Sequence, residues 1–198
     1  MNTSQLRIEI NKFSKRYRHK YIYKDFSYVF DNSKINILKS PNGYGKSTLI
    51  KAILDIIKYN GKIKTNIKSF SYLPEKINLP SYIKVERFLT LMEIPRDKYL
   101  PLLDIFNVDK SKMINELSKG MRQKVLITNA ILCDADGYIF DEPLNGLDDA
   151  SCDIFKKLIH DLYINQKLII IATHQIEKFN DLLNDIKIIR LEDINVII

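Results

Sequence analysis

Nine consecutive residues in the first quarter of the chain have the types and order needed to hold a phosphate group. They run from Ser40 to Thr48 and read Ser-Pro-Asn-Gly-Tyr-Gly-Lys-Ser-Thr. A strand-like segment, 34–39, precedes them, and an apolar helical segment, 48–58, follows and is closed by Asn60-Gly61. A strand, a glycine-containing turn and a helix N-terminus direct several backbone N–H groups and a partial positive charge at one point. These residues predict a phosphate-binding loop; the alternative is a chance loop before a helix.

The polar residues of this loop have expected partners on a nucleotide. Lys46 is expected to reach the β- and γ-phosphates, and the Ser47 hydroxyl is expected to ligate Mg²⁺. The usual loop opens with glycine, whereas Ser40 stands there in this chain. Because serine rarely adopts a positive φ angle, either this position is not left-handed or the loop is slightly reshaped. The other expected nucleotide contacts of the loop are Asn42, Gly43, Tyr44, Gly45 and Thr48.

An apolar strand that ends in two carboxylates, Tyr138 to Glu142, supplies candidates for the chemistry itself. In phosphate-loop enzymes a carboxylate at such a strand end holds Mg²⁺, so Asp141 is the expected metal partner. The neighbouring Glu142 could polarise the attacking water as a general base. Ordinary strand exits carry the same pattern, and only the phosphate loop upstream gives it weight.

A second phosphate receptor is suggested by residues 117–124, which read Leu-Ser-Lys-Gly-Met-Arg-Gln-Lys. Ser118 stands where a helix N-cap belongs, before an apolar helical segment. A hydroxyl and the N–H of Gly120 at a helix N-terminus are suited to bind phosphate. A routine capped helix explains the pattern equally well.

Composition limits the class of protein. The chain has 198 residues, of which 45% are hydrophobic and 28% charged, which is typical of one globular domain. Its longest uncharged apolar run, 168–173, is far shorter than a membrane span, and residues 2–5 lack the apolar stretch expected of a secretion signal. Cys133 and Cys152 have no metal-ligand spacing, so we expect buried free thiols and a cytosolic protein.

The net charge of +7 is unevenly distributed. Residues 1–68 hold 15 Lys and Arg against 4 Asp and Glu, which gives +11, whereas the remainder is acidic at −4. A basic face suits nucleotide phosphates, anionic lipids or nucleic acid, and a solvated surface is an equal alternative. Because no basic motif with interleaved aromatic residues is present, nucleic acid is not expected as a partner.

The order of elements predicts an α/β fold. Alternating segments near Leu6–Ile10 and Phe26–Phe30 indicate antiparallel strands, and 67–73 is strand-like. A helical stretch, 82–107, is expected to be interrupted at Pro95 and Pro101. From Lys119 onward helices and strands alternate, which indicates a parallel sheet with helices on both faces, and a terminal pair of strands is expected over 186–198.

Taken together, five segments resemble the nucleotide-binding subunit of an ABC transporter. They are 40–48, 117–123, 138–142, Leu147-Asp148 and Thr173-His174, in this order. The resemblance covers essentially the whole chain. It implies a P-loop NTPase core with a mixed, mainly parallel sheet, an N-terminal antiparallel β subdomain and a small helical subdomain at about 76–118, all within one ATPase domain of residues 1–198.

The same resemblance implies roles for four further residues. Tyr17, with Tyr21 and Tyr23 as rivals, is similar to the aromatic residue that stacks on adenine. Glu75 stands where the family usually has Gln, in the loop that couples nucleotide to the membrane partner, and can still approach Mg²⁺. Asp148 falls in the loop that crosses the dimer interface, and His174 is expected to contact the γ-phosphate and the attacking water.

The resemblance therefore implies an ATPase that binds ATP and Mg²⁺ and works as a homo- or heterodimer. Each ATP would lie between one subunit's Lys46 loop and the other's Ser118 helix. Transport would run through separate integral membrane subunits, with this chain peripheral on the cytoplasmic face, and the Leu-Ser-Lys-Gly-Met form of residues 117–121 is similar to that of exporters. Two rivals are a soluble ABC ATPase of DNA repair or ribosomes and a degenerate heterodimer partner. The soluble ATPase is disfavoured because this chain has neither the coiled-coil insertion of DNA-repair members nor the second ATPase half of ribosomal members. The degenerate partner is disfavoured because Lys46, Glu142 and His174 are intact.

Overall fold

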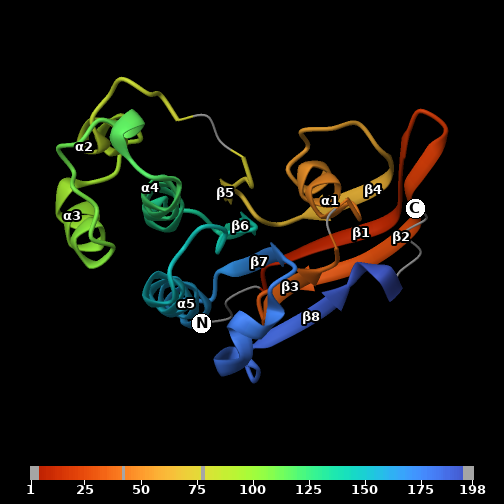
Figure 1. Ribbon diagram of the computed structural model, residues 1–198. Helices are drawn as coiled ribbons and strands as arrows, with labels where there is room; N and C mark the ends of the chain where they lie inside the picture. The colour runs from red at the N-terminus through yellow and green to blue at the C-terminus, as the bar shows by residue number, and fades with distance from the viewer. Residues whose placement is uncertain (1–4, 42, 77–78, 194–198) are drawn as a thin grey trace.

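Two sheets and the helices packed against them make up the computed structural model, which describes residues 5–41, 43–76 and 79–193 (Figure 1). In chain order the elements are β1 (Arg7–Tyr17), β2 (Lys20–Asp31), β3 (Ile35–Lys39), α1 (Lys46–Ile53), β4 (Asn60–Thr65), β5 (Phe70–Leu73), α2 (Val85–Leu91), α3 (Arg96–Ile105), α4 (Lys119–Leu132), β6 (Gly137–Asp141), α5 (Asp149–Ile164), β7 (Leu168–Thr173) and β8 (Ile186–Arg190). Short 3-10 turns lie at Ile114–Glu116, Ile176–Leu182 and Leu191–Asp193.

The larger sheet has five strands in the order β5-β6-β7-β3-β8, and all of its pairings are parallel. Its inner strands are apolar on both faces because both faces are covered, and every residue of β7 is buried. Ile169 and Ile171 join the core under α4 and α5, whereas Leu168 and Ile170 join the core that contains α1. The predicted α/β fold with helices on both faces is confirmed.

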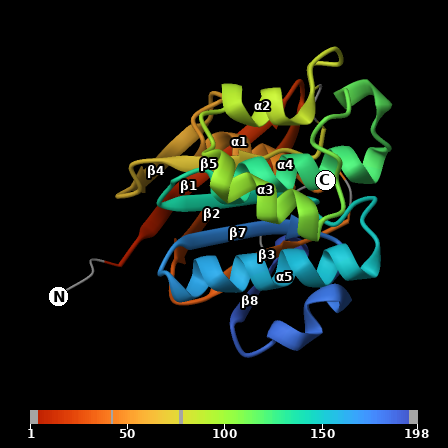
Figure 2. The ribbon, with the colours of Figure 1, turned by 90° about the vertical axis from the view of Figure 1, so that its left-hand side faces the viewer.

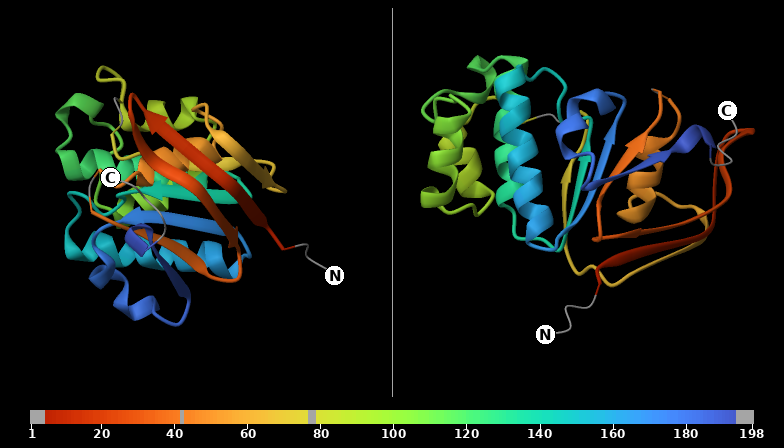
Figure 3. Two further views of the ribbon diagram at one scale, coloured as in Figure 1. Left: turned by 90° about the vertical axis from the view of Figure 1, so that its right-hand side faces the viewer. Right: turned by 90° about the horizontal axis from the view of Figure 1, so that it is seen from below.

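The smaller sheet is antiparallel, with β1 between β2 and β4. It lies on the α1 side of the parallel sheet, so α1 is enclosed between two layers of strands (Figures 1 and 3). The alternation predicted around Leu6–Ile10 is borne out, since Ile8 and Ile10 are buried and face Phe30 and Tyr28. The β1–β2 hairpin of this sheet carries Tyr17 and Ile22, which line the same pocket as the N-terminal end of α1.

Helices α2 and α3 lie beyond α4, on the side away from the strands (Figures 1 and 2). α3 packs on α4. The chain breaks before Pro95 as predicted, but the predicted interruption at Pro101 is wrong, because Pro101 lies within α3. Pro101 has no N–H to donate to the carbonyl of Asp97. Because both residues are exposed, water can donate to that carbonyl instead.

Two boundaries differ from the prediction. α1 ends at Ile53 rather than continuing to Lys58, and Asp55 follows with a left-handed φ of 56°. The predicted terminal strand pair is replaced by β8, which pairs in parallel with β3 at the sheet edge. The rest of that prediction falls on residues 194–198, outside the described residues.

The helices in the described ranges have at most 16 residues. α5, the longest, has 16 residues and buries one face, which includes Phe155 and Ile159. In the part of the chain that the structure describes, no helix combines the length and the apolar character that a membrane crossing requires.

Candidate active site

The phosphate loop joins β3 to α1, and its described glycines take the left-handed backbone. Gly43 has φ 87° and Gly45 has φ 90°, whereas Ser40 does not have a positive φ. The first of the two possibilities for Ser40 is therefore the one observed. A Cβ added at Gly45 would lie 2.6 Å from Cγ2 of Ile22 and 2.8 Å from the ring of Tyr23, so this position needs glycine for space as well as for conformation.

Lys46 is buried at the start of α1, with 5% of its side chain exposed. Its ammonium donates to the backbone carbonyl of Ser40 at 2.7 Å and to that of Pro41 at 3.4 Å. It also lies 3.3 Å from Oε1 of Glu142, a side chain that is 4% exposed. A buried charge requires a partner of opposite charge or good hydrogen bonds, and Lys46 has both.

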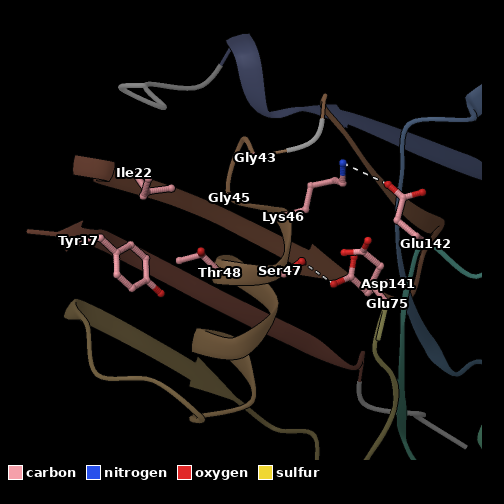
Figure 4. A pocket seen from close by; sticks show the side chains of 10 residues that line it. All are labelled: Tyr17, Ile22, Gly43, Gly45, Lys46, Ser47, Thr48, Glu75, Asp141 and Glu142. Atoms are coloured by element: carbon pink, nitrogen blue, oxygen red, sulfur yellow. Dashed lines mark hydrogen bonds and ion pairs between the residues drawn. The ribbon is translucent and has the colours of Figure 1, made fainter. Parts of the chain in front are cut away.

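A second polar residue of the loop, Ser47, contacts the strand-end carboxylate. Its hydroxyl donates to Oδ2 of Asp141 at 2.6 Å. Burial raises the pKa of Asp141 above its usual value; the Ser47 hydrogen bond opposes this shift, and repulsion from Glu75 and Glu142 adds to it. The predicted metal ligands Ser47, Glu75 and Asp141 all line one pocket, shown in Figure 4.

This set of oxygen donors fits Mg²⁺, a hard cation that prefers carboxylate, hydroxyl and phosphate oxygens. A cation at Asp141 would also relieve the electrostatic cost of burying that carboxylate. Among the residues described here, no three His, Cys, Asp or Glu side chains are grouped to hold a metal by themselves. Mg²⁺ would therefore require nucleotide oxygens in addition to Ser47 and Asp141, as is usual where the metal arrives with a phosphate ligand.

Glu142 follows β6 and is held by several side chains. Nδ1 of His174 lies 3.1 Å from Oε1 and 3.0 Å from Oε2, and the Thr173 hydroxyl donates to Oε2 at 3.2 Å. Glu142 has a φ of 51°, which is uncommon for a residue with a side chain and costs about 1–3 kcal/mol. Its N–H donates to the carbonyl of Ala172, which fixes the strained residue to β7.

The pocket has a volume of about 290 Å³, and Tyr17 and Ile22 form its end away from the carboxylates (Figure 4). Tyr17 is half exposed, as a stacking platform must be, whereas Tyr23 is buried and donates to the carbonyl of Gly45. Tyr21 does not line the pocket. The geometry therefore favours Tyr17 over both rivals.

The remaining loop residues differ in position. Thr48 lines the pocket together with Gly43 and Gly45, whereas Tyr44 does not line it and is partly buried. Asn42, also predicted as a nucleotide contact, lies outside the described residues.

Four predicted contacts outside the loop, Ser118, Gly120, Asp148 and His174, do not line this pocket. Ser118 caps α4 and accepts from the N–H of Met121 at 3.2 Å, and its side chain is exposed. Asp148 caps α5 by accepting from the N–H of Ser151, and these hydrogen bonds and nearby Lys124 lower the pKa of Asp148 to about 2. Both are therefore structural caps within this chain as well as exposed groups.

The segment between Glu142 and α5 is bound closely to α4. A Cβ added at Gly120 would lie 2.5 Å from the carbonyl oxygen of Gly146, so the two backbones touch. Gln123 donates to the carbonyl of Pro143 at 2.9 Å, and Lys124 pairs with Asp148 at 3.0 Å. Any movement of this segment must therefore be shared with the N-terminal half of α4.

No role is predicted from the sequence for Ile22 or for the Thr173 side chain, and Tyr23 is considered only as a rival adenine-stacking residue. Ile22 and Tyr23 shape the phosphate loop and the pocket, and Thr173 contacts Glu142. Ile22 and Tyr23 belong to an apolar strand pattern that any sheet would have. Thr173 precedes His174, and a polar side chain at the end of an apolar strand was the one signal in the sequence that it could belong to the site.

Comparisons with known proteins agree with this geometry. The family model described as "ABC transporter" matches residues 23–145. An uncharacterized ABC transporter ATP-binding protein of Methanocaldococcus jannaschii is 32% identical, over 93% of this chain and 74% of that protein. The zinc import ATP-binding protein ZnuC of Buchnera aphidicola (subsp. Baizongia pistaciae) is 34% identical, over 78% of this chain and 68% of that protein. Relatives with an import name do not support the export expected from residues 117–121.

Solved structures with the same fold include a putative ABC transporter ATP-binding protein from Pyrococcus furiosus, with a TM-score of 0.81 and 24% identity over 96% of this chain and 99% of that one. A second, titled as an ATP-binding subunit of an ABC transporter, has a TM-score of 0.79 and 26% identity over 93% and 86% of the two chains. The first comparison supports the fold alone. With the family model and the relatives, the conclusion is that this chain belongs to the ABC transporter family, as an ATP-binding subunit with ATPase activity.

Proposed function

We propose that two ATPase subunits, two copies of this chain or this chain and a homologue, enclose ATP between them and hydrolyse it to drive transport through separate integral membrane subunits. In this proposal each ATP contacts the Lys46 loop of one subunit and the Ser118 end of α4 of the other. Binding of ATP closes the dimer, and hydrolysis opens it.

The observation that carries the proposal is the separation of the two phosphate receptors. Lys46, Ser47, Asp141 and Glu142 line one pocket, whereas Ser118 is exposed elsewhere and has no part in lining it. A helix N-terminus with an exposed hydroxyl is suited to bind a phosphate group that another chain presents.

The chemistry proposed for this chain is proton transfer and charge stabilisation. When ATP enters, the Lys46 ammonium leaves the Glu142 carboxylate and pairs with the β- and γ-phosphates. Glu142 is then free to accept a proton from the attacking water. His174, which contacts the same carboxylate, would hydrogen-bond the γ-phosphate and the water. Cleavage of the bond between the β- and γ-phosphates yields ADP and phosphate.

Mg²⁺ would be held by Ser47 and Asp141, with Glu75 nearby, and would supply positive charge against the phosphate oxygens. Tyr17 would stack on the adenine at the opposite end of the pocket. Ile22, beside it, would contact the base from the adjacent strand. These roles account for each described side chain that lines the pocket except Thr48, which borders the α1 end.

The membrane subunits are proposed to dock near Glu75 and on the helical segment after it, with the chain peripheral on the cytoplasmic face. Phe88 and Leu89 are buried and belong to the core. Tyr82 and Met92, by contrast, are 84% and 49% exposed, as a docking surface requires. Charged substitutions at Tyr82 and Met92 would test this surface, because transport should fall while nucleotide binding by the subunit is retained.

A mixed dimer tests the shared site. Lys46→Ala and Ser118→Arg should each abolish hydrolysis in a pure homodimer, because every site loses the phosphate contacts of one subunit. When the two inactive variants are co-expressed with different tags, one site of the mixed dimer combines both defects and the other is wild type. Purified doubly tagged dimer should therefore occlude ATP at one site, with partial return of hydrolysis if the sites are coupled.

One result would contradict the shared site, and one variant serves as the control. If Ser118 acted within its own chain, both sites of the mixed dimer would remain defective, and no ATP would be occluded in a dimer verified by both tags. Ser33→Arg, an exposed substitution near β3 and outside the pocket, is the control for the effect of an added arginine. Mixed with Lys46→Ala, it should also leave one intact site.

A further inference from the structure

We propose that the buried hydroxyl of Thr173 positions Glu142 for proton transfer, a role that rests on the proposed function of Glu142 as the base. Thr173 is the last residue of β7 and is fully buried, with 0% exposed. Its hydroxyl donates to Oε2 of Glu142 at 3.2 Å. Thr173 is thus a positioning residue, since it acts through Glu142 and does not line the nucleotide pocket.

The direction of this hydrogen bond is determined by a second one. The backbone N–H of Gln175 donates to the Thr173 hydroxyl oxygen at 3.1 Å. A hydroxyl has one proton to donate, and a backbone N–H can only donate, so the Thr173 proton is directed at Glu142. Gln175 is itself held, because its side-chain amide donates to Oδ1 of Asn145 at 3.1 Å.

Thr173 differs from the other described contacts of the Glu142 carboxylate. Lys46 and His174 are the other two. In the proposed function, both turn to the phosphates or the water when ATP is bound. The hydroxyl of Thr173 remains available to Oε2 because it belongs to a central strand, paired on both sides. With Oε2 held, Oε1 is the oxygen that Lys46 vacates, and it is left facing the pocket as the proton acceptor.

Two substitutions separate the hydroxyl from the shape of the side chain. Thr173→Val retains the β-branched shape and removes the proton, whereas Thr173→Ser retains the hydroxyl. Because a hydrogen bond to a charged group is strong, we expect Thr173→Val to lower kcat by about 10- to 100-fold. The KM for ATP should stay within about twofold, and Thr173→Ser should restore most of kcat. The matched control is Thr128→Val, since Thr128 is buried in α4 and donates to the carbonyl of Lys124.

The decisive measurement is single-turnover ATP hydrolysis by the purified subunit with and without Glu142→Gln. If Thr173 acts through Glu142, adding Thr173→Val to Glu142→Gln should lower the residual rate by less than about twofold. The proposed base itself fails if Glu142→Gln alone keeps the wild-type rate. With that role established, the Thr173 inference is overturned by a wild-type kcat in Thr173→Val, by failure of Thr173→Ser to restore kcat, or by an undiminished loss in the double variant.

Discussion

Replacement of Glu142 by glutamine should destabilise the nucleotide-free protein as well as slow hydrolysis. The Lys46 ammonium and the Glu142 carboxylate are 3.3 Å apart, and both side chains are at least 95% buried, being 5% and 4% exposed. At an effective dielectric constant of about 20, two such charges attract by about 5 kcal/mol. The Ser40 and Pro41 carbonyls still accept from Lys46 in the variant. We therefore expect a net loss of about 3 kcal/mol, the low end for a broken buried ion pair.

For a chain of 198 residues this loss corresponds to a decrease in Tm of about 6–12 °C, measurable by differential scanning calorimetry without nucleotide. Saturating MgATP should remove most of the difference, since phosphate oxygens replace the carboxylate beside Lys46, while turnover falls by about 10²-fold or more. Glu75→Gln is the control, because Glu75 lines the same pocket but is exposed. A nucleotide-free Tm within about 2 °C of wild type, or an equal decrease in Glu75→Gln, would refute the reasoning.

Three further outcomes are expected. Tyr17→Ala should weaken ATP binding by about tenfold in a fluorescent-nucleotide titration, through loss of base stacking, whereas Tyr21→Ala should not. Gly45→Ala should lower the free energy of unfolding by about 1–3 kcal/mol in urea titrations and abolish ATP binding, because the new Cβ meets Ile22 at 2.6 Å and φ is 90°; normal binding would contradict this. Burial raises the pKa of Asp141, so its charged form opposes folding at neutral pH. Asp141→Asn should therefore raise the nucleotide-free Tm at pH 7, and this gain should shrink as the pH falls through the raised pKa.

The phosphate loop and the strand-end carboxylates could be predicted from the sequence because their chemistry is local. Gly45 indicates a left-handed backbone, and Lys46 and Ser47 directly after it are the side chains expected to contact phosphate and Mg²⁺. The same holds for a buried strand that ends in Asp141 and Glu142. In each case neighbouring residues provide the whole pattern.

Contacts between distant segments could not be predicted in this way. Ile22 and Thr173 are ordinary strand residues in sequence, and only the packing of β2 on the loop and of β7 beside β6 brings them to the site. The C-terminal end of α1, expected at Lys58 and found at Ile53, also depends on packing with distant segments. Residues beyond Ile53 are apolar enough to continue the helix, but Ile57 packs against the core that contains α1 while Ile56 is 58% exposed.

The backbone contact between Gly120 and Gly146 has a consequence for genetic experiments on this chain. Alleles that place a larger residue at position 120 push on the segment after Glu142 in the same polypeptide, since an added Cβ would lie 2.5 Å from the Gly146 carbonyl oxygen. Their phenotypes therefore combine two lesions, one at the exposed end of α4 and one in the chain's own segment beside the base. Second-site suppressors of such alleles are expected in cis, among residues 143–148, and a complementation test that assumes a defect only between subunits would misassign them.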